Sequence, residues 1–221
     1  MPPGTHALVS ARIRAPTARR PPINAANARQ PLFRITFPPH IAAVNHGAKS
    51  IVLIGMMGAG KSSVGRCLQR RTGLARFDTD EVVASKFGLP IPEIFAQQGE
   101  DCFREMETQV LVEFAPAQAA IVVTGGGIVL REQNVPLLKR LGTVIWLEAE
   151  ENTLFERASR RGDRPLLKTE NPRGMFSQLL RERTPLYARA ADLRVNTTNS
   201  THDDVADVIL EEIESRMAAN N

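Results

Sequence analysis

The segment Ile51-Val-Leu-Ile-Gly-Met-Met-Gly-Ala-Gly-Lys-Ser-Ser63 decides the fold of this chain. Its first four residues form a short apolar run, which predicts a buried strand, and a helical pattern begins at Lys61. Between them, residues 55–62 match G-x-x-x-x-G-K-[ST] in the strand, loop and helix context that this motif requires. The sequence therefore predicts a P-loop, which binds the phosphates of a nucleotide.

The residue types of this loop explain its chemistry. Glycines let the backbone wrap a phosphate without Cβ clashes, and N–H groups at a helix N-terminus present positive potential to it. Lys61 would place a charge on the β- and γ-phosphate oxygens, and Ser62 would offer its hydroxyl to Mg²⁺. The alternative is a glycine turn that precedes a helix by chance, which we expect in roughly one chain per hundred. The expected nucleotide-binding residues are Gly58, Ala59, Gly60, Lys61, Ser62 and Ser63.

From residue 50 onward, short β-branched runs alternate with longer helical patterns. This order predicts an α/β fold with three α/β/α layers and a five-stranded parallel sheet, whose ligands bind outside the carboxyl ends of the strands. We expect the domain to span residues 49–218, with a polar lid at about residues 160–172. The expected strands are 51–55, 76–80, 120–125, 143–147 and 193–197. The expected helices are 61–72, 102–114, 132–141, 151–161, 176–190 and 203–217.

Residues 1–48 differ from the rest of the chain because they are rich in Pro and Arg, and no Asp or Glu occurs before Asp78. Prolines at this density block helix and sheet, and few large apolar residues are present to offset chain entropy. We therefore predict a disordered, basic extension. Two interpretations of it stay open: an unstructured or over-extended N-terminus, or an organellar transit peptide, although Ser10 is its only serine.

Composition narrows the class of protein. With 43% hydrophobic residues among 221, the chain can bury a core. Cys67 and Cys102 are too few for a disulfide framework, which fits a reducing cytoplasm, and both are expected to pack as small apolar side chains. No apolar run approaches the roughly 20 residues of a membrane span, so no membrane partner is expected. Because the basic excess lies in the extension, no nucleic-acid partner is expected, and we expect a monomer.

Five ordered motifs carry a family resemblance. With these gaps they resemble the shikimate kinase family over about residues 49–217. The resemblance implies a P-loop kinase fold, and transfer of the γ-phosphate of ATP, with Mg²⁺, to shikimate to give shikimate 3-phosphate for aromatic amino acid biosynthesis. After the P-loop, the motifs are Phe77-Asp-Thr-Asp80, Gly99-Glu-Asp-Cys-Phe-Arg-Glu-Met-Glu107, Thr124-Gly-Gly-Gly127, Arg164-Pro-Leu-Leu167 and Arg183-Thr-Pro-Leu-Tyr187.

Asp78 and Asp80 stand at the end of the second expected strand. Alternation along a strand predicts that their side chains point to opposite faces. The resemblance implies that Asp78 helps hold Mg²⁺, while Asp80 contacts the acceptor and takes the proton from the attacking hydroxyl. The alternative for Asp80 is a plain N-cap of a helix that starts near Glu81.

Arg104 and Glu107 share a helix face at i, i+3 spacing, which is ordinarily a solvated surface pair. The resemblance instead places Arg104 on the substrate carboxylate, with Glu107 orienting its guanidinium and Arg183 as the second arginine. Two arginines at one site suit an anion, because the guanidinium keeps its charge and forks onto a carboxylate. By the same resemblance Gly126 and Gly127 touch the acceptor; the alternative is a flexible turn.

Arg164 lies in the expected lid and completes the implied catalytic set with Asp80 and Lys61. A positive charge that arrives with the lid would stabilise charge on the transferred phosphoryl group. The alternative for Arg164 is a solvated loop residue. Either Arg160 or Arg161 is expected to flank the adenine.

Two rival functions are open at this point. One is a related kinase for gluconate or a nucleoside monophosphate, although two arginines and a triple glycine favour a compact acid. The other is a ligand sensor that keeps a kinase-like domain without turnover. The presence of Lys61, Asp80 and Arg164 argues for turnover.

Overall fold

Five parallel strands form the sheet of the computed structural model, which describes residues 49–114, 116, 118–160 and 165–219. The spatial order of the strands is β2-β3-β1-β4-β5. The strand β1 therefore lies at the centre, between β3 and β4, and its carboxyl end opens where the strand order changes direction. The strands are β1 (Ser50–Ile54), β2 (Ala75–Asp78), β3 (Ala120–Val123), β4 (Gly142–Glu148) and β5 (Leu193–Asn196).

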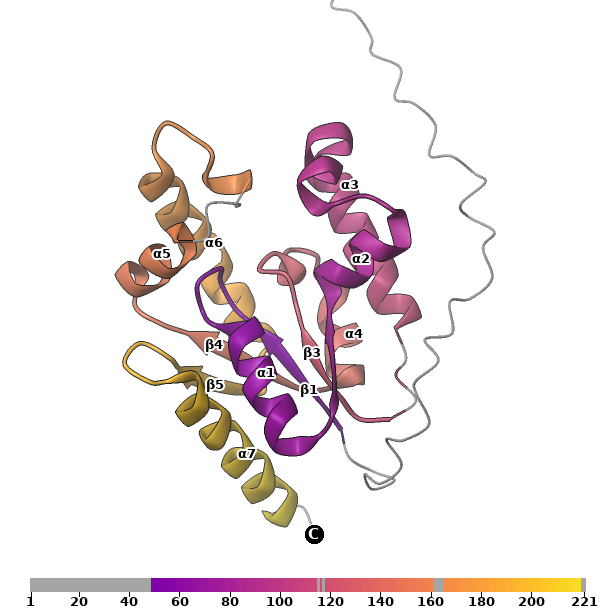
Figure 1. Ribbon diagram of the computed structural model, residues 1–221, viewed down its shortest axis with the longest axis vertical. Coiled ribbons are helices and arrows are strands. Elements are labelled where there is room, and N and C mark those ends of the chain that lie inside the picture. The colour runs from indigo at the N-terminus through magenta and orange to yellow at the C-terminus, as the bar shows by residue number, and fades with distance from the viewer. Residues whose placement is uncertain (1–48, 115, 117, 161–164, 220–221) are drawn as a thin grey trace, which may run out of the picture. The chain divides into compact units, whose positions relative to one another are not determined.

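Helices cover both faces of this sheet, as Figure 1 shows. The helices α1 and α7 pack together against one face, while α4 and α6 pack against β4 from the other. The α-helices are α1 (Lys61–Thr72), α2 (Thr79–Phe87), α3 (Ile91–Glu113), α4 (Asn134–Leu141), α5 (Glu151–Ser159), α6 (Pro172–Ala190) and α7 (His202–Ala219). Short 3-10 turns occur at η2 (Ile128–Leu130) and η3 (Pro165–Leu167).

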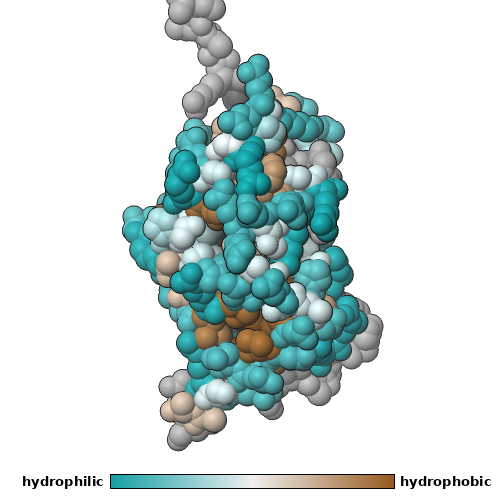
Figure 2. Space-filling model, turned by 90° about the vertical axis from the view of Figure 1, so that its left-hand side faces the viewer, coloured by the Kyte–Doolittle hydropathy of each residue, from teal (hydrophilic) through white to brown (hydrophobic). Residues whose placement is uncertain are grey.

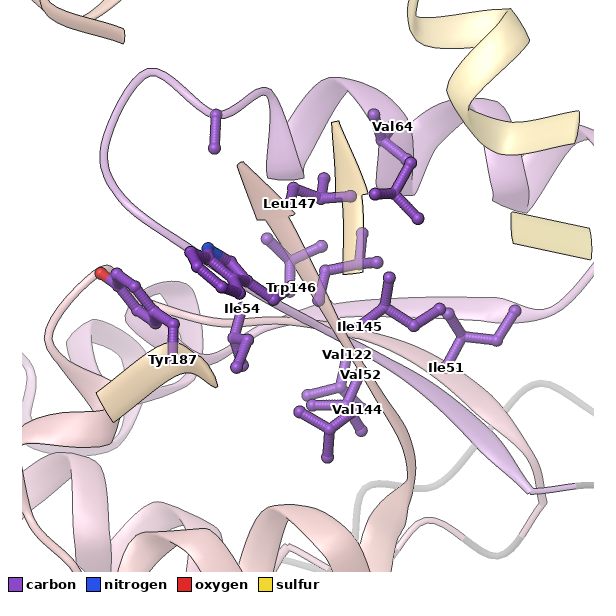
Figure 3. Packing of buried hydrophobic residues seen from close by; sticks show 14 of the residues in the cluster. Ile51, Val52, Ile54, Val64, Val122, Val144, Ile145, Trp146, Leu147 and Tyr187 are labelled. Atoms are coloured by element: carbon purple, nitrogen blue, oxygen red, sulfur yellow. The ribbon is translucent and has the colours of Figure 1, made fainter. Parts of the chain in front are cut away.

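The core explains why the central strands read as continuous apolar runs. Val52 of β1 is aligned with Val122 of β3 and Val144 of β4, and all three side chains are fully buried. Figure 3 shows the alternation between faces along β4: Leu147 lies on the same side of the sheet as Val64 of α1, and Trp146 lies on the same side as Tyr187 of α6. Parallel strands that are covered on both faces need apolar residues at every position, because neither face meets water.

A second, smaller cluster lies under α2 and α3. Its buried members are Val83, Ile94, Phe103, Met106 and Val110. The helix α3 is broken at Gly99, whose φ of 82° and ψ of 172° are not helical. The second part of α3 also carries the Arg104 and Glu107 side chains. Packing of the smaller cluster therefore holds the helix segment that positions these two residues.

The expected five-stranded parallel sheet and three-layer order are confirmed, with strand ends moved by one to two residues. One expectation about the second strand is wrong. The strand β2 ends at Asp78, and Asp80 lies in the first turn of α2, so these carboxylates do not alternate along a strand. The N-cap is Asp78 rather than Asp80, because its carboxylate accepts the Asp80 N–H at 3.1 Å and so starts the helix.

Three of the expected helices have different ends in the structure. The helix expected at 102–114 is the second part of a longer element that starts at Ile91. The one expected at 176–190 begins at Pro172, where Asn171 caps it by accepting the Gly174 N–H at 2.9 Å. The one expected at 151–161 ends at Ser159. The extension at 1–48 lies outside the described residues.

One face of the molecule is mainly hydrophilic (Figure 2). Figure 2 shows one face in which a hydrophobic patch interrupts a mostly polar surface. Within the described ranges, the large apolar residues that are exposed are Val112, Leu130, Val208 and Met217. Of the helices that the structure describes, none is both long enough and apolar enough to cross a membrane.

The central strand should dominate stability. Leu53 is 0% exposed, so Leu53→Ala should lower the free energy of unfolding by about 3 kcal/mol, because it removes buried methyl groups and leaves a cavity. Val112 is 56% exposed, and Val112→Ala should stay within about 0.5 kcal/mol of the parent. Urea denaturation followed by circular dichroism measures both. Equal effects of the two substitutions would contradict the assignment of the core.

Candidate active site

A cavity of about 360 Å³ opens at the carboxyl ends of β1, β2 and β3. Parallel strands end at the same edge of a sheet, so the loops that follow them meet there. The cavity is lined by Met57, Gly58, Gly60, Lys61, Ser62, Ser63, Asp78, Asp80, Thr124, Gly125, Gly126, Arg157, Arg160 and His202. Most of the residues expected to bind nucleotide, metal or acceptor therefore face one space.

The P-loop takes the backbone shape that its glycines allow. Gly58 has a φ of 87°, and a Cβ at this position would lie 2.2 Å from the Leu154 carbonyl oxygen. The helix α1 begins at Lys61 with no side-chain cap and no acidic residue in its first turn. The Ser63 N–H donates to the Gly60 carbonyl oxygen at 2.9 Å, so an anion would meet the N–H groups that precede it at the start of the helix.

Lys61 lies across the loop. Its Nζ donates to the carbonyl oxygens of Gly55 at 2.7 Å and Met56 at 3.1 Å. The ammonium group is thus held over the cavity, where phosphate oxygens would be its stronger partners because they are charged. The role of Lys61 on the phosphate oxygens stays a prediction.

Asp78 and Asp80 both line the cavity, in spite of the wrong strand expectation. The N-cap geometry brings them to the same side, since Asp78 precedes the first turn of α2 and Asp80 lies within it. Burial raises the pKa of the Asp78 carboxyl above its ordinary value, and the hydrogen bond from the Asp80 N–H opposes this shift. A nearby cation would favour the ionised form of Asp78.

Two carboxylates lie close to Gly125, the first glycine of the turn that follows β3 (the glycine turn, residues 125–127). A Cβ placed on Gly125 would lie 2.6 Å from Asp80 Oδ1 and 2.7 Å from Glu107 Oε1. Two oxygens from α2 and α3 therefore approach the same point of the backbone. Only glycine leaves room for both, so this residue type at position 125 is required by the site itself.

Arg104 lies against the same turn. A Cβ on Gly127 would lie 2.2 Å from the guanidinium carbon of Arg104. Arg104 Nη1 donates to Glu107 at 2.6 Å, and Arg104 Nε and Nη2 donate to Glu100 at 3.2 Å and 2.7 Å. With Arg104 7% exposed and Glu107 0% exposed, the solvated surface pair is wrong.

Arg183 reaches the turn from α6. It is 2% exposed, and its Nη1 donates to the carbonyl oxygen of Gly126 at 3.3 Å. Its Nε is buried and has no acceptor within the described part of the chain. The structure therefore brings both expected arginines to one glycine turn, with Arg104 at Gly127 and Arg183 at Gly126.

Glu107 has the most perturbed acidity among the residues around the turn. Burial raises its pKa to about 7, although Arg104 opposes the shift, and the charge of Asp80 adds to it. Its Oε2 accepts from Arg104, while its Oε1 has no partner among the residues that the structure describes. At a pH between 4.5 and about 7, a larger fraction of Glu107 is therefore protonated than of an exposed glutamate.

Two cavity residues, Arg157 and His202, lie outside every motif and every site residue expected from the sequence. Arg157 donates to Thr197 Oγ1 at 3.2 Å and to the carbonyl oxygens of Thr197 and Thr198 at 3.0 Å and 3.1 Å, so it fixes the loop that leads to α7. His202 begins α7, and its ring lies 3.3 Å from where a Cβ on Gly60 would sit. The spacing of Arg157 and Arg160 on one helix face was a usable signal, whereas nothing local links His202 to the P-loop.

Arg160 lines the cavity, as one of the two arginines expected near the adenine. Arg161 and Arg164 lie outside the described residues, as does the part of the expected lid at residues 161–164. Cys67 is buried in the main core, and Cys102 is half-buried beside the smaller cluster, in agreement with the packing role expected of each.

The acidity of Glu107 makes the stability of the protein depend on pH. Its pKa is about 7 in the folded protein and about 4.5 in an unfolded chain, so between these values the folded state holds the proton that the unfolded state has lost. The free energy of unfolding should therefore fall as pH rises from 4.5 to 7. Glu107→Gln cannot titrate, and relative to the parent it should gain about 2 kcal/mol between pH 5 and pH 7.5. Urea denaturation at both pH values measures this, and parallel profiles for the two proteins would contradict it.

Comparison with known proteins gives the same family as the motifs. The family model described as shikimate kinase matches residues 57–214. A shikimate kinase of Thermodesulfovibrio yellowstonii is 42% identical over 166 residues, which cover 75% of this chain and 95% of that protein.

Solved structures agree. The shikimate kinase from Acinetobacter baumannii in complex with shikimate has a TM-score of 0.73 at 38% identity, covering 77% of this chain and 95% of that chain. The enzyme from Aquifex aeolicus has a TM-score of 0.64 at 31% identity, covering 76% of this chain and 98% of that chain. With the P-loop, the glycine turn and both arginines in one place, the chain belongs to the shikimate kinase family.

Proposed function

We propose that the residues around the cavity divide the reaction of this family between a nucleotide end and an acceptor end. The reaction is the ATP-dependent phosphorylation of shikimate, a step that supplies precursors of aromatic amino acids. One observation carries the proposal: Asp80, Glu107, Arg104 and Arg183 meet at the glycine turn that borders the P-loop cavity. A phosphate donor and a small acid would be held side by side there.

At the nucleotide end, the backbone of Gly58, Ala59 and Gly60 and the first turn of α1 would hold the phosphates, with Ser62 and Ser63 beside them. Lys61 would exchange its bonds to loop carbonyls for the β- and γ-phosphate oxygens. The base end would lie toward Arg160 and His202, which line the cavity on the side of α5 and α7. Arg164 of the lid would add a charge to the transferred group.

The donors for Mg²⁺ would be the Ser62 hydroxyl and the Asp78 carboxylate, both of which line the cavity. Within the described part, no group of three or more His, Cys, Asp or Glu side chains is placed to hold a metal. Magnesium in kinases needs fewer protein ligands, since phosphates and waters complete its octahedron, so this donor set fits the ion. When bound, the ion would offset the charge of the phosphate oxygens.

At the acceptor end, Arg104 and Arg183 would bind the carboxylate of shikimate. A guanidinium has five N–H donors, and the described contacts of Arg104 use three, so two are left for a ligand. The buried Arg183 Nε would gain an acceptor from the same carboxylate. Gly126 and Gly127 would contact the ring, because their lack of Cβ allows close approach.

Asp80 would act as the general base. Its carboxylate lines the cavity and approaches Gly125, so it faces the space between the two ends. A hydroxyl bound there would give its proton to Asp80 as its oxygen attacks the γ-phosphorus, and ADP would leave in line. Exclusion of water by the lid would prevent simple hydrolysis.

We also propose that the enzyme works in the cytoplasm as a monomer. Cys67 and Cys102 are free thiols in the structure, which suits a reducing compartment.

An assay of ADP release tests the function. The protein should release ADP when shikimate is added, and not with gluconate or a nucleoside monophosphate. Asp80→Asn should lower kcat at least about 100-fold, because a general base contributes 10²–10⁴-fold, while ATP binding is kept. Release that is independent of shikimate would contradict the proposal, and binding of both ligands without release would favour the sensor.

The carboxylate clamp is tested by Arg104→Lys, which keeps a positive charge beside Glu107 and loses the planar fork. Hydrogen bonds to charged groups contribute about 1.5–3 kcal/mol, so the KM for shikimate should rise roughly 10- to 100-fold while the KM for ATP stays within about twofold. The matched control is Arg189→Lys on α6, where the side chain is 55% exposed and pairs with Glu132. An unchanged KM for shikimate in Arg104→Lys would contradict the proposed binding of the carboxylate by Arg104.

A further inference from the structure

The peptide between Gly126 and Gly127 needs an external support. Both neighbouring residues lack Cβ, so backbone sterics restrain this peptide much less than a peptide between residues that carry side chains. Its N–H, on Gly127, donates to no acceptor among the described residues. Hydrogen bonds to its carbonyl oxygen must therefore set its orientation.

Two donors on α6 meet that carbonyl. The Tyr187 hydroxyl donates to Gly126 O, and Arg183 Nη1 donates to the same oxygen at 3.3 Å. Arg183 and Tyr187 are one helical turn apart and therefore lie on one face of α6. In a trans peptide the C=O and N–H point in opposite directions, so donors that draw the carbonyl toward α6 turn the Gly127 N–H away from it.

The position of Tyr187 is itself fixed by packing. The side chain is 0% exposed, and its ring stacks on Trp146 with centroids 5.9 Å apart and planes at 28°. Figure 3 shows the ring beside Trp146, with the hydroxyl at the edge of the apolar cluster. The other nearby acceptor, Met56 Sδ at 3.9 Å, is weak, so the hydroxyl proton goes to Gly126. Burial raises the pKa of Tyr187 to about 12, which keeps the hydroxyl a donor.

We propose that Tyr187 is a positioning residue, whose hydroxyl holds the Gly126–Gly127 peptide so that the Gly127 N–H is presented to an oxygen of the acceptor acid. This inference rests on the proposed function, because it assigns the support of the acceptor end of that site. Arg183 alone would hold the carbonyl less firmly, since its bond is long and its guanidinium also serves the ligand. Removal of the hydroxyl would keep the stacking on Trp146, because the ring of Tyr187 makes that contact.

The test is Tyr187→Phe, which removes one oxygen and keeps the ring. Shikimate Kd, measured by calorimetry, and KM should both rise about tenfold, which is the effect of one well-placed hydrogen bond. The KM for ATP should stay within about twofold, and thermal melting should show a folded protein. The matched control is Thr184→Val on the same helix, which removes a hydroxyl bonded only to the Leu180 carbonyl at 2.7 Å and should leave shikimate binding within about twofold.

Each outcome decides the inference. A rise in shikimate Kd that is confined to Tyr187→Phe supports the positioning role. Shikimate binding within about twofold of the parent overturns it, whatever the melting temperature. Equal losses for ATP and shikimate, or the same loss in Thr184→Val, also overturn it, because they report general loosening of α6. A parent protein that binds shikimate but releases no ADP contradicts the proposed function alone, since the Kd values still decide the role of Tyr187.

Discussion

The buried ion pair between Arg104 and Glu107 is the interaction on which the acceptor end depends. Moving two charges out of water costs several kcal/mol for each ion, and only close contact with good hydrogen bonds offsets this cost. Here the pair meets at 2.6 Å, and Glu100 takes two further donors of the arginine. The guanidinium is thereby held in one orientation before any ligand arrives, which is the preorganisation that binding requires.

The glycine turn makes this arrangement sterically feasible. Gly125 leaves room for two carboxylate oxygens, and Gly127 leaves room for a guanidinium. The turn can stand at the end of β3 because that strand pairs with β1 and β2, whose own ends carry the P-loop and Asp78. The order of the strands thus places the P-loop beside the glycine turn, although residues 62 and 125 lie more than 60 positions apart in the chain.

Much of this was predictable from the sequence, because the strongest signals are local. The P-loop, the alternation of strands and helices, and the i, i+3 spacing of Arg104 and Glu107 can each be read within a short window. The orientation of Asp80 could not, since a carboxylate at position 78 can either extend the strand or cap a helix, and tertiary contacts with β3 decide. The assignment of Arg104 to the site came only from the family resemblance, because its spacing to Glu107 alone is that of a surface pair. The contacts of Arg157 with Thr197 and of His202 with Gly60 join distant segments, which no local pattern encodes.

Two buried polar atoms link the thermal stability of the protein to ligand binding. Arg183 Nε and Glu107 Oε1 are both withdrawn from water with no partner among the described residues, which costs free energy in the fold. A ligand that satisfies such atoms binds only the native state and so shifts the melting equilibrium by mass action. Melting curves recorded over a series of small acids would therefore rank those acids by their affinity for the native state, independently of whether any phosphate moves.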